Sequence, residues 1–350
     1  MRSRLLGRPG EARQPWLGLA GLLLVLPIAA LLAFAGGPET AVRVLGPLVA
    51  TALAPVAMVA FWWNRWPGTT LRPAWSGWVD TVVIAVLALA LALVGQVVVG
   101  RADLRGLVDP TPGVGHTPTY PVLIPIGAAA FTAMLQLTHV IEGWPLRRLP
   151  SVPGGLVALA IAYLLAVALY LLLVEVHPPK GVAIRPRDGV LNGAEFGAML
   201  TMIGAWQIWL YLAWHGWPFT TIRSAGIRRA LATVVIIAGG LLTYTGLRRW
   251  VEPDTLVAVG GAAVAAGLVV SVLFAGTLRP FVSAGTDRVA SLLVIGALTV
   301  LLYNGISSYA DIRTWSGVVT SEAWRAQAAS ALSLSVVLHV AIGRRWPFGH

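Results

Sequence analysis

Residues 194–223 read AEFGAMLTMIGAWQIWLYLAWHGWPFTTIR. About twenty mostly apolar residues come first, which is the length that an α-helix needs to cross a bilayer. The run ends at Gly216-Trp217-Pro218, and Thr220-Thr221-Ile222-Arg223 follows. Proline cannot continue a helix, and it biases the residue before it away from helical geometry. This stretch therefore predicts a membrane-spanning helix that stops at the membrane interface.

Apolar runs of similar length recur along the 350 residues. The chain is 57% hydrophobic and 11% charged, with a mean hydropathy of +0.78, whereas soluble domains carry about 25% charged residues. We therefore predict an all-α, polytopic membrane protein with about ten transmembrane helices. The runs lie at 16–36, 41–63, 78–100, 120–143, 153–175, 194–214, 227–247, 254–275, 286–304 and 322–343. Residues 16–343 form one helical bundle in this interpretation, 1–15 a basic N-terminal segment and 344–350 a short basic tail.

The Trp-Pro pair recurs along the chain. It stands at Trp66-Pro67, Trp144-Pro145, Trp217-Pro218 and Trp346-Pro347. A degenerate copy, Thr277-Leu278-Arg279-Pro280, matches Thr70-Leu71-Arg72-Pro73, and on this match Leu273 takes the Trp position. Successive spacings are then 78, 73, 56 and 73 residues, and each interval holds two apolar runs. Self-similarity of this kind indicates a repeated supersecondary unit, here about five two-helix hairpins.

Tryptophan and arginine in these segments fit an anchoring role. Indole rings favour the headgroup level of a bilayer, and arginine is enriched in the loops on the cytoplasmic side. We therefore predict that the Trp-Pro segments end helices and fix them at the interface. The predicted membrane-interface anchors are Trp66, Trp144, Trp217, Trp346, Arg72, Arg223 and Arg279.

The charge distribution predicts the orientation of the chain. An even number of spans puts both termini on one side, and that side holds 15 of the 25 Lys and Arg residues but only 4 of the 14 acidic ones. The two faces therefore carry 15 − 4 = +11 and 10 − 10 = 0. By the positive-inside rule both termini are cytoplasmic, in the cytoplasmic membrane. The basic excess faces anionic lipid headgroups, and no nucleic-acid partner is expected.

Few polar side chains lie at membrane depth, and such groups are functional by default. Gln136, His139 and Glu142 follow at i, i+3 and i+6, so we expect them to share one broad helix face. A His with a Glu one turn later can bind a metal or relay protons, and the alternative is hydrogen bonding to neighbouring helices. The candidates for a substrate or proton path are Gln136, His139, Glu142, Gln207 and His339. His139 and His339 stand at similar depths, and the sequence leaves open whether they meet.

Several classes of protein are excluded. The chain has no cysteine, so disulfides, thiolate metal sites and cysteine nucleophiles are excluded. It has no Gly-rich phosphate loop, zincin motif or dinucleotide fingerprint. We predict no cofactor, no metal site and no assigned catalytic residue.

The first hypothesis is a transporter or permease, because internal repeats recur in transporter folds. One alternative is a membrane-embedded subunit or scaffold that binds a partner through its Trp-Pro loops. Another is an intramembrane enzyme for a lipid or isoprenoid, with His139 and Glu142 as an acid–base pair. Enzymatic activity is the less favoured reading. The expected partners are the lipid bilayer and either further copies of the chain or a partner membrane subunit, and the sequence does not identify a small-molecule substrate.

Overall fold

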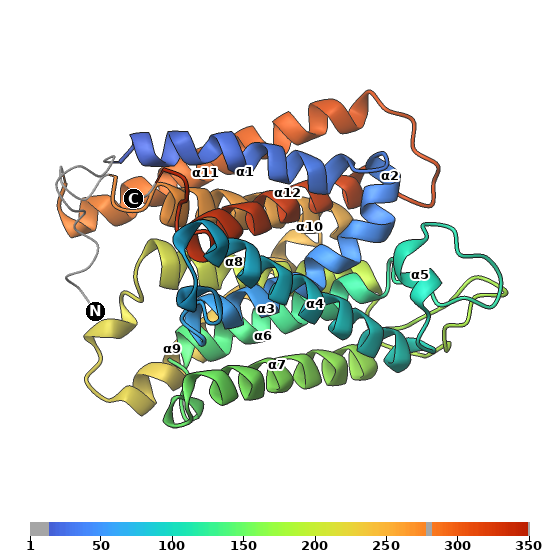
Figure 1. Cartoon of the computed structure of the whole chain (residues 1–350), viewed down its shortest axis with the longest axis horizontal. Coiled ribbons are helices and arrows are strands. Elements are labelled where there is room, and N and C mark those ends of the chain that lie inside the picture. The colour runs from blue at the N-terminus through green and yellow to red at the C-terminus, as the bar shows by residue number, and fades with distance from the viewer. Residues whose placement is uncertain (1–13, 278–281, 349–350) are drawn as a thin grey trace.

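The computed structural model describes residues 14–277 and 282–348, and this part of the chain is almost entirely helical (Figure 1). Two isolated β-bridges, Val174–Leu191 and Val176–Arg187, occur in one loop. Ten helical segments of the described residues are long and apolar enough to span a membrane. They are Trp16–Phe34, Pro38–Phe61, Trp75–Val99, Leu123–Val140, Ser151–Leu173, Gly193–Ala213, Ala225–Leu247, Pro253–Leu273, Ala284–Asp311 and Ser321–Ile342. The predictions of an all-α fold and of about ten helices long and apolar enough to span a membrane are confirmed.

The spans alternate between an inner and an outer position. In the even-numbered spans, 50–67% of the most apolar 18-residue stretch is buried inside the protein, whereas in the odd-numbered spans 6–33% of it is buried. The inner helices are α3 (Gly46–Phe61), α6 (Leu123–Leu135), α8 (Gly193–Gln207), α10 (Pro253–Leu268) and α12 (Ser321–Val337). The outer helices are α1 (Trp16–Phe34), α4 (Pro73–Val99), α7 (Ser151–Leu173), α9 (Ala225–Leu247) and α11 (Ala284–Asp311).

The inner helices form a closed ring. Around the ring α3 packs on α6, α6 on α8, α8 on α10, α10 on α12, and α12 returns to α3. Each outer helix covers the inner helix that precedes it in the chain, so that α4 lies on α3, α7 on α6, α9 on α8 and α11 on α10. The first helix, α1, lies on the last inner helix, α12. The N-terminal span therefore supplies the fifth outer helix.

The described part of the chain begins and finishes at one end of the bundle (Figure 1), which we call the turn end because the inner helices finish there. Four of them finish in a π-helical turn: η3 (Gln136–Val140), η5 (Ile208–Ala213), η7 (Val269–Leu273) and η8 (Leu338–Ile342). After α3, the N–H of Trp63 donates to the carbonyl of Met58, five residues back, at 3.1 Å. All five inner helices therefore end with hydrogen bonds that are one residue wider than in an α-helix.

A common tight turn follows each of these helix ends. The N–H groups of Trp66, Trp144, Trp217 and Trp346 each donate to the carbonyl three residues back, at 2.9–3.1 Å. The peptide bond to the following proline is cis in all four turns. In the turn after α10, the N–H of Thr277 makes the same bond to Phe274 at 3.2 Å. Thr277, and not Leu273, therefore occupies the Trp position there. The interval from Trp217 is 277 − 217 = 60 residues and the next is 346 − 277 = 69.

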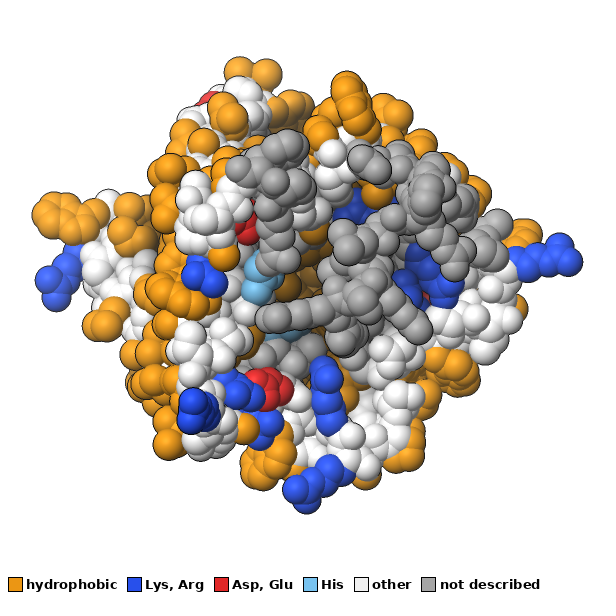
Figure 2. Space-filling view, turned by 90° about the vertical axis from the view of Figure 1, so that its left-hand side faces the viewer, with side chains coloured by type: hydrophobic (Ala, Val, Ile, Leu, Met, Phe, Trp, Pro, Cys, Tyr) orange, Lys and Arg blue, Asp and Glu red, His pale blue; other side chains and the backbone are white. Residues whose placement is uncertain are grey.

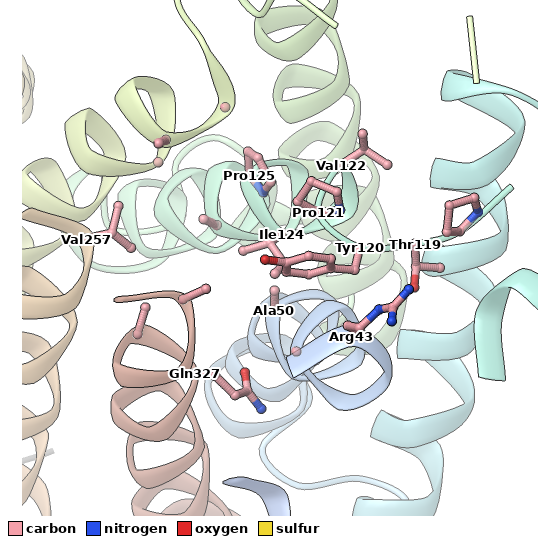
Figure 3. Close-up of a pocket in the computed structure, with 18 of the residues that line it drawn as sticks. Arg43, Ala50, Thr119, Tyr120, Pro121, Val122, Ile124, Pro125, Val257 and Gln327 are labelled. Atoms are coloured by element: carbon pink, nitrogen blue, oxygen red, sulfur yellow. The ribbon is translucent and has the colours of Figure 1, made fainter. Parts of the chain in front are cut away.

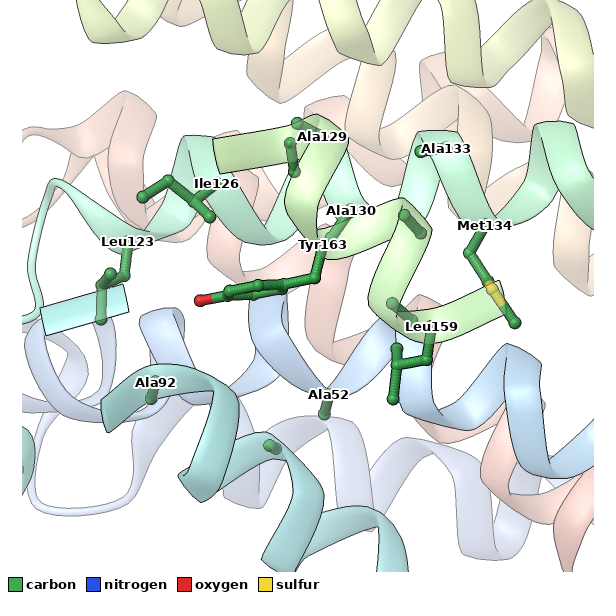
Figure 4. Close-up of a cluster of buried hydrophobic side chains, with 14 of the residues drawn as sticks. Ala52, Ala92, Leu123, Ile126, Ala129, Ala130, Ala133, Met134, Leu159 and Tyr163 are labelled. Atoms are coloured by element: carbon green, nitrogen blue, oxygen red, sulfur yellow. The ribbon is translucent and has the colours of Figure 1, made fainter. Parts of the chain in front are cut away.

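Small residues allow the helices to approach closely. Lipid provides no hydrophobic drive for helix association, so contact between backbones through glycine and alanine is an important source of packing energy. A Cβ at Gly127 in α6 would lie 2.6 Å from the carbonyl carbon of Ala50 in α3. The cluster between α3, α4, α6 and α7 in Figure 4 is likewise rich in alanine, with Tyr163 in its centre. The Tyr163 hydroxyl donates to the backbone carbonyl of Leu91 at 2.5 Å.

Gly127→Val is expected to lower the thermal stability of the purified protein, because the new methyl groups must displace the α3 backbone. Overpacking of this kind costs about 1–3 kcal/mol. The matched control is Gly296→Val on α11, where an added Cβ meets no atom within 4 Å. Thermal unfolding in detergent compares the two variants. Equal melting temperatures would contradict the close α3–α6 contact.

Candidate functional site

A cavity of about 1080 Å³ lies inside the ring of inner helices. All five inner helices line it, whereas among the outer helices only α7 contributes a side chain, that of Tyr170. It reaches the surface at the end opposite the turns, which we call the loop end, because exposed loop residues such as Val114 also line it. Figure 3 shows this part of the cavity. The loops concerned are 109–122 and 174–184.

The walls of the cavity are formed by residues at equal distances before the five turns. We call the residue that donates the turn hydrogen bond the turn residue; the five are Trp66, Trp144, Trp217, Thr277 and Trp346. Sixteen residues before each turn residue, the lining residues are Ala50, Ala128, Thr201, Gly261 and Ser330. Twenty residues before it, they are Gly46, Ile124, Gly197, Val257 and Ala326. Most are small, and the polar ones among them carry hydroxyl groups. The cavity is wide because these side chains are too short to reach the centre of the ring.

Larger side chains close the cavity towards the turn end. Nine residues before the turn residue, the side chains are Ala57, Leu135, Ile208, Leu268 and Val337, and all line a second cavity of about 50 Å³. Five residues before it, Phe61, His139, Leu212, Val272 and Ala341 line the same small cavity. Four residues line both cavities: Leu53, Phe131, Leu135 and Ile208. We call these four the plug, since they separate the large cavity from the small one.

The predicted polar candidates do not form one site. Gln207 Nε2 donates to Gln136 Oε1 at 2.9 Å, and Gln136 Nε2 donates to Thr233 Oγ1 at 2.9 Å. Gln207 Nε2 also lies 3.1 Å from the Thr132 carbonyl. These bonds join α6, α8 and α9, and neither glutamine lines the cavities. Gln136 and Gln207 are thus brought together as a link between helices.

The prediction that Glu142 shares a helix face with Gln136 and His139 is wrong. The helix ends in η3 at Val140, and Glu142 has a positive φ of 57°, so it no longer follows the helical register of His139. Arg228 holds its carboxylate from two sides, with Nε at 2.8 Å and Nη2 at 2.9 Å, and Arg229 Nη2 lies 3.0 Å from the same group. Glu142 therefore ties the end of α6 to the start of α9, while His139 lines the small cavity beside Phe61, with ring centroids 4.8 Å apart.

His339 lies on the opposite side of its helix from the cavities. A Cβ at Gly21 of α1 would lie 2.9 Å from its Nε2, so the imidazole packs between α12 and α1. The ring of Phe348 is its other aromatic neighbour, at 6.4 Å. His139 and His339 therefore occupy different environments, one lining the small cavity and the other between helices.

The predicted anchors lie at the turn end. Trp66, Trp144, Trp217 and Trp346 are 37–53% exposed. The guanidinium of Arg229 lies over Trp144 at 5.9 Å, and that of Arg288 lies over Trp217 at 4.7 Å. Arg72 and Arg223 are exposed just before α4 and α9 begin, whereas Arg279 lies outside the described residues. Figure 2 shows this face, with arginine side chains around a hollow and histidine side chains near its middle.

The loop end is stabilised by polar contacts of its own. Asp103 accepts hydrogen bonds from the backbone N–H of Thr117 at 2.7 Å, and its carboxylate lies 2.9 Å from His116 Nδ1. Gln96, fully buried in α4, donates to the carbonyls of Asp103 and Thr117. Within residues 14–277 and 282–348, no group of three His, Asp or Glu side chains is placed to hold a metal ion.

No protein-family model, curated protein or solved structure matches this chain.

Single cysteines are expected to report the depth of the plug. The natural chain has no cysteine, and a thiol reacts as its thiolate, which apolar surroundings disfavour. Ser330→Cys, in the large cavity, should react with a charged maleimide at a rate within about tenfold of exposed Thr314→Cys. Val337→Cys, in the small cavity, should react about a hundredfold more slowly. Similar rates at positions 330 and 337 would show that water passes the plug.

Glu142→Gln is expected to lower the free energy of unfolding by about 0.5–1 kcal/mol, since the ion pair is partly exposed. Arg228 and Arg229 then lose their shared counter-charge. Thermal unfolding of Glu142→Gln, Arg228→Gln and the double variant tests this. The double variant should lose less than the sum of the single ones, because both remove the same contact. If the double variant loses the sum of the two single losses in stability, the ion pair between Glu142 and Arg228 does not contribute to stability.

Proposed function

We propose that this protein is a membrane permease in which a small solute passes along the axis of the inner ring. The observation that carries the proposal is the large cavity, lined by all five inner helices and separated by the four-residue plug from a smaller cavity towards the turn end. A cavity that reaches the surface on one side and is closed by apolar side chains on the other is the arrangement expected of a gated path. Hydrophobic constrictions gate such paths by excluding water.

The recurrence of an inner helix, a turn and an outer helix along the chain supports this function. The proposal includes five repeated hairpins, each made of an inner helix, a Trp-Pro type turn and an outer helix. Equivalent positions counted back from the five turns line the two cavities at each level. A repeat of this kind gives each level of the path five side chains. In this proposal α1 belongs to the fifth hairpin, although it comes first in the chain.

The proposal also assigns an orientation. With the turn end in the cytoplasm of a cell and the loop end outside, the basic residues and the exposed indoles face anionic headgroups of the cytoplasmic membrane. The large cavity then opens outward. This arrangement corresponds to an outward-facing state, and substrate release requires the plug to widen.

The subunit alternative is favoured by one observation, the four exposed tryptophans at the turn end. In that case the indoles bind a partner and not lipid. A pull-down of the tagged protein in mild detergent, followed by mass spectrometry, separates these ideas. A partner at one-to-one abundance would favour the subunit, and recovery of the chain alone or with further copies of itself would favour the permease. An acid–base pair of His139 and Glu142 gains no support, because two arginines bind Glu142.

Flux through liposomes tests the permease. The double substitution Leu53→Ala and Phe131→Ala should raise the permeability to small polar solutes by about tenfold or more, because it widens the plug. Both side chains are only partly buried, so less packing is lost than at Leu135 or Ile208. Stopped-flow light scattering with neutral, anionic, cationic and zwitterionic solutes is the measurement. Leu87→Ala on α4, which packs against the hydrophobic core and lines neither cavity, is the control for packing loss.

A blocking variant completes the test. Gly204 lines the cavity at the level of Leu53 and Phe131, and a Cβ there meets no atom within 4 Å. Gly204→Trp, added to the widened variant, should return the permeability to that of empty liposomes. Gly296→Trp on α11 should not. A widened variant no more permeable than empty liposomes would overturn the proposal.

A further inference from the structure

Ionisable side chains of the large cavity gather at its loop end. Apart from two tyrosines, seven line it, and four belong to the loops that cover the opening: Asp109, Glu175, His177 and Lys180. The other three belong to the inner spans: Arg43 in η1 (Ala41–Leu45), just before α3, Asp254 in the first turn of α10, and Glu322 in that of α12. Deeper levels of this cavity carry none. Any charge recognition on the inner spans therefore occurs at this level.

Glu322 is already engaged. Its Oε1 lies 2.6 Å from Arg325 Nη1, and Oε2 accepts from the Ser321 hydroxyl at 2.8 Å. Across residues 14–277 and 282–348, Arg43 and Asp254 show no ion pair and no side-chain hydrogen bond. Glu39, one helical turn before Arg43, accepts a hydrogen bond from the backbone N–H of Ser316 at 2.9 Å. One cation and one carboxylate thus line the cavity without a direct contact to an opposite charge in the described residues, although the charges of Glu39 and Arg43 interact over a longer distance.

Arg43 and Asp254 lie at the same level. Both stand 23 residues before their turn residues, Trp66 and Thr277, and Ala323 holds the equivalent position on α12 between them. Their helices are two places apart in the ring, which corresponds to an axial separation of about 13–16 Å. Both residues line the cavity, and Ala323 between them has a small side chain that leaves the gap open. The space is suited to a small molecule more than to a direct ion pair.

Tyr120 lies between the two charges. Figure 3 shows its ring extending across the cavity, with Arg43 on one side and α10, at Val257, on the other. Tyr120 precedes the span at Leu123–Val140, and burial raises the pKa of its hydroxyl to about 12, with Asp254 raising it and Arg43 lowering it. Both charges therefore act on this hydroxyl, which keeps its proton. An aromatic face next to a carboxylate also favours an ammonium group.

We infer that the cavity mouth binds a small zwitterion, with its anionic group on Arg43 and its ammonium group near Asp254 and the face of Tyr120. This inference rests on the proposed function and names the class of its substrate. The planar guanidinium donates two parallel hydrogen bonds to a carboxylate or phosphate. The carboxylate of Asp254 supplies the opposite charge. A ligand with both groups at the correct separation satisfies two otherwise unpaired charges, and a ligand with one group leaves the other unpaired.

Isothermal titration of the purified protein with ω-amino acids of increasing length tests the inference. Glycine, 3-aminopropanoate, 4-aminobutanoate and 6-aminohexanoate vary only the distance between the charges. We expect one length to bind best, and butanoate or butylamine to bind about tenfold more weakly, since a hydrogen bond to a charged group is lost. Glycerophosphoethanolamine provides the same charges as a lipid headgroup does. Binding of that compound alone would assign the zwitterion to lipid.

Two substitutions locate the site. Arg43→Gln and Asp254→Asn should each weaken binding of the best ω-amino acid by about tenfold. The exchange Arg43→Asp with Asp254→Arg should restore part of the affinity, because the ligand can bind in the reverse direction. Lys180→Gln and Glu175→Gln, in the covering loops, are the matched controls and should change the affinity by less than about twofold. Elution of each variant as a single species in size exclusion checks its folding, and Arg43→Lys tests the two-bond geometry if Arg43→Gln is unstable.

Equal affinity for single-charge analogues, or unchanged affinity in both neutral variants, would overturn the inference. Either result leaves the permease intact if the widened plug still raises permeability. Zwitterion binding without any flux through the widened variant would instead overturn the permease and retain the binding site.

Discussion

Five helices packed side by side around one axis leave a space at the centre that only side chains can fill. With neighbouring axes about 8–10 Å apart, the helix axes lie about 7–8.5 Å from the centre. The backbone takes about 2.3 Å of this, so side chains must cover about 4.5–6 Å. Glycine, alanine and serine cannot do so, whereas leucine, isoleucine and phenylalanine can. The large cavity and the plug both follow from this single constraint, through the size of the residue at each level.

The same constraint explains where polar groups are found. Side chains that point between helices find partners on the neighbouring helix, as Gln136 does with Gln207 and Thr233. Among the side chains that line the cavity, Glu322 and Gln327 have protein partners, whereas Arg43 makes no side-chain hydrogen bond within the described residues. A polar residue is therefore structural or available to a ligand according to the partners that the surrounding side chains and backbone supply. Depth in the membrane does not distinguish the two cases.

The sequence predicted the ten spans, because an apolar run of about twenty residues has one main physical explanation. It also identified the Trp-Pro turns. It did not separate inner from outer helices, because both kinds are apolar. In addition, residues at the same level of the cavity have side chains of similar size but are often different amino acids. Counting back from each turn would have found those levels, provided that Thr277 had been aligned with the tryptophans. The alignment on Leu273 shifted the fourth copy by four residues.

The candidate site was the part least accessible to sequence reasoning. A regular helix was assumed through Glu142, but the π-helical turn changes the register and the positive φ of Glu142 ends it. A prediction that residues share one face of a helix fails at such points, because it requires the 3.6-residue period of the α-helix to continue without interruption. Arg43 and Asp254 are 211 residues apart in the chain, and only the closed ring places them at one level. No local pattern could have paired them.

The packing of α1 against α12 has a consequence for biogenesis. Spans enter the membrane in the order in which the ribosome makes them, and every other outer helix follows directly after the inner helix that it covers. The first span, by contrast, packs mainly on Ser321–Val337, which is synthesised last of the ten, and makes further contacts with the end of the Pro253–Leu273 span. Until then much of its surface faces lipid, for which its uninterrupted run of apolar residues is suited. The first helix to be inserted is thus the last to find its place, and assembly of the ring is completed only when synthesis is almost finished.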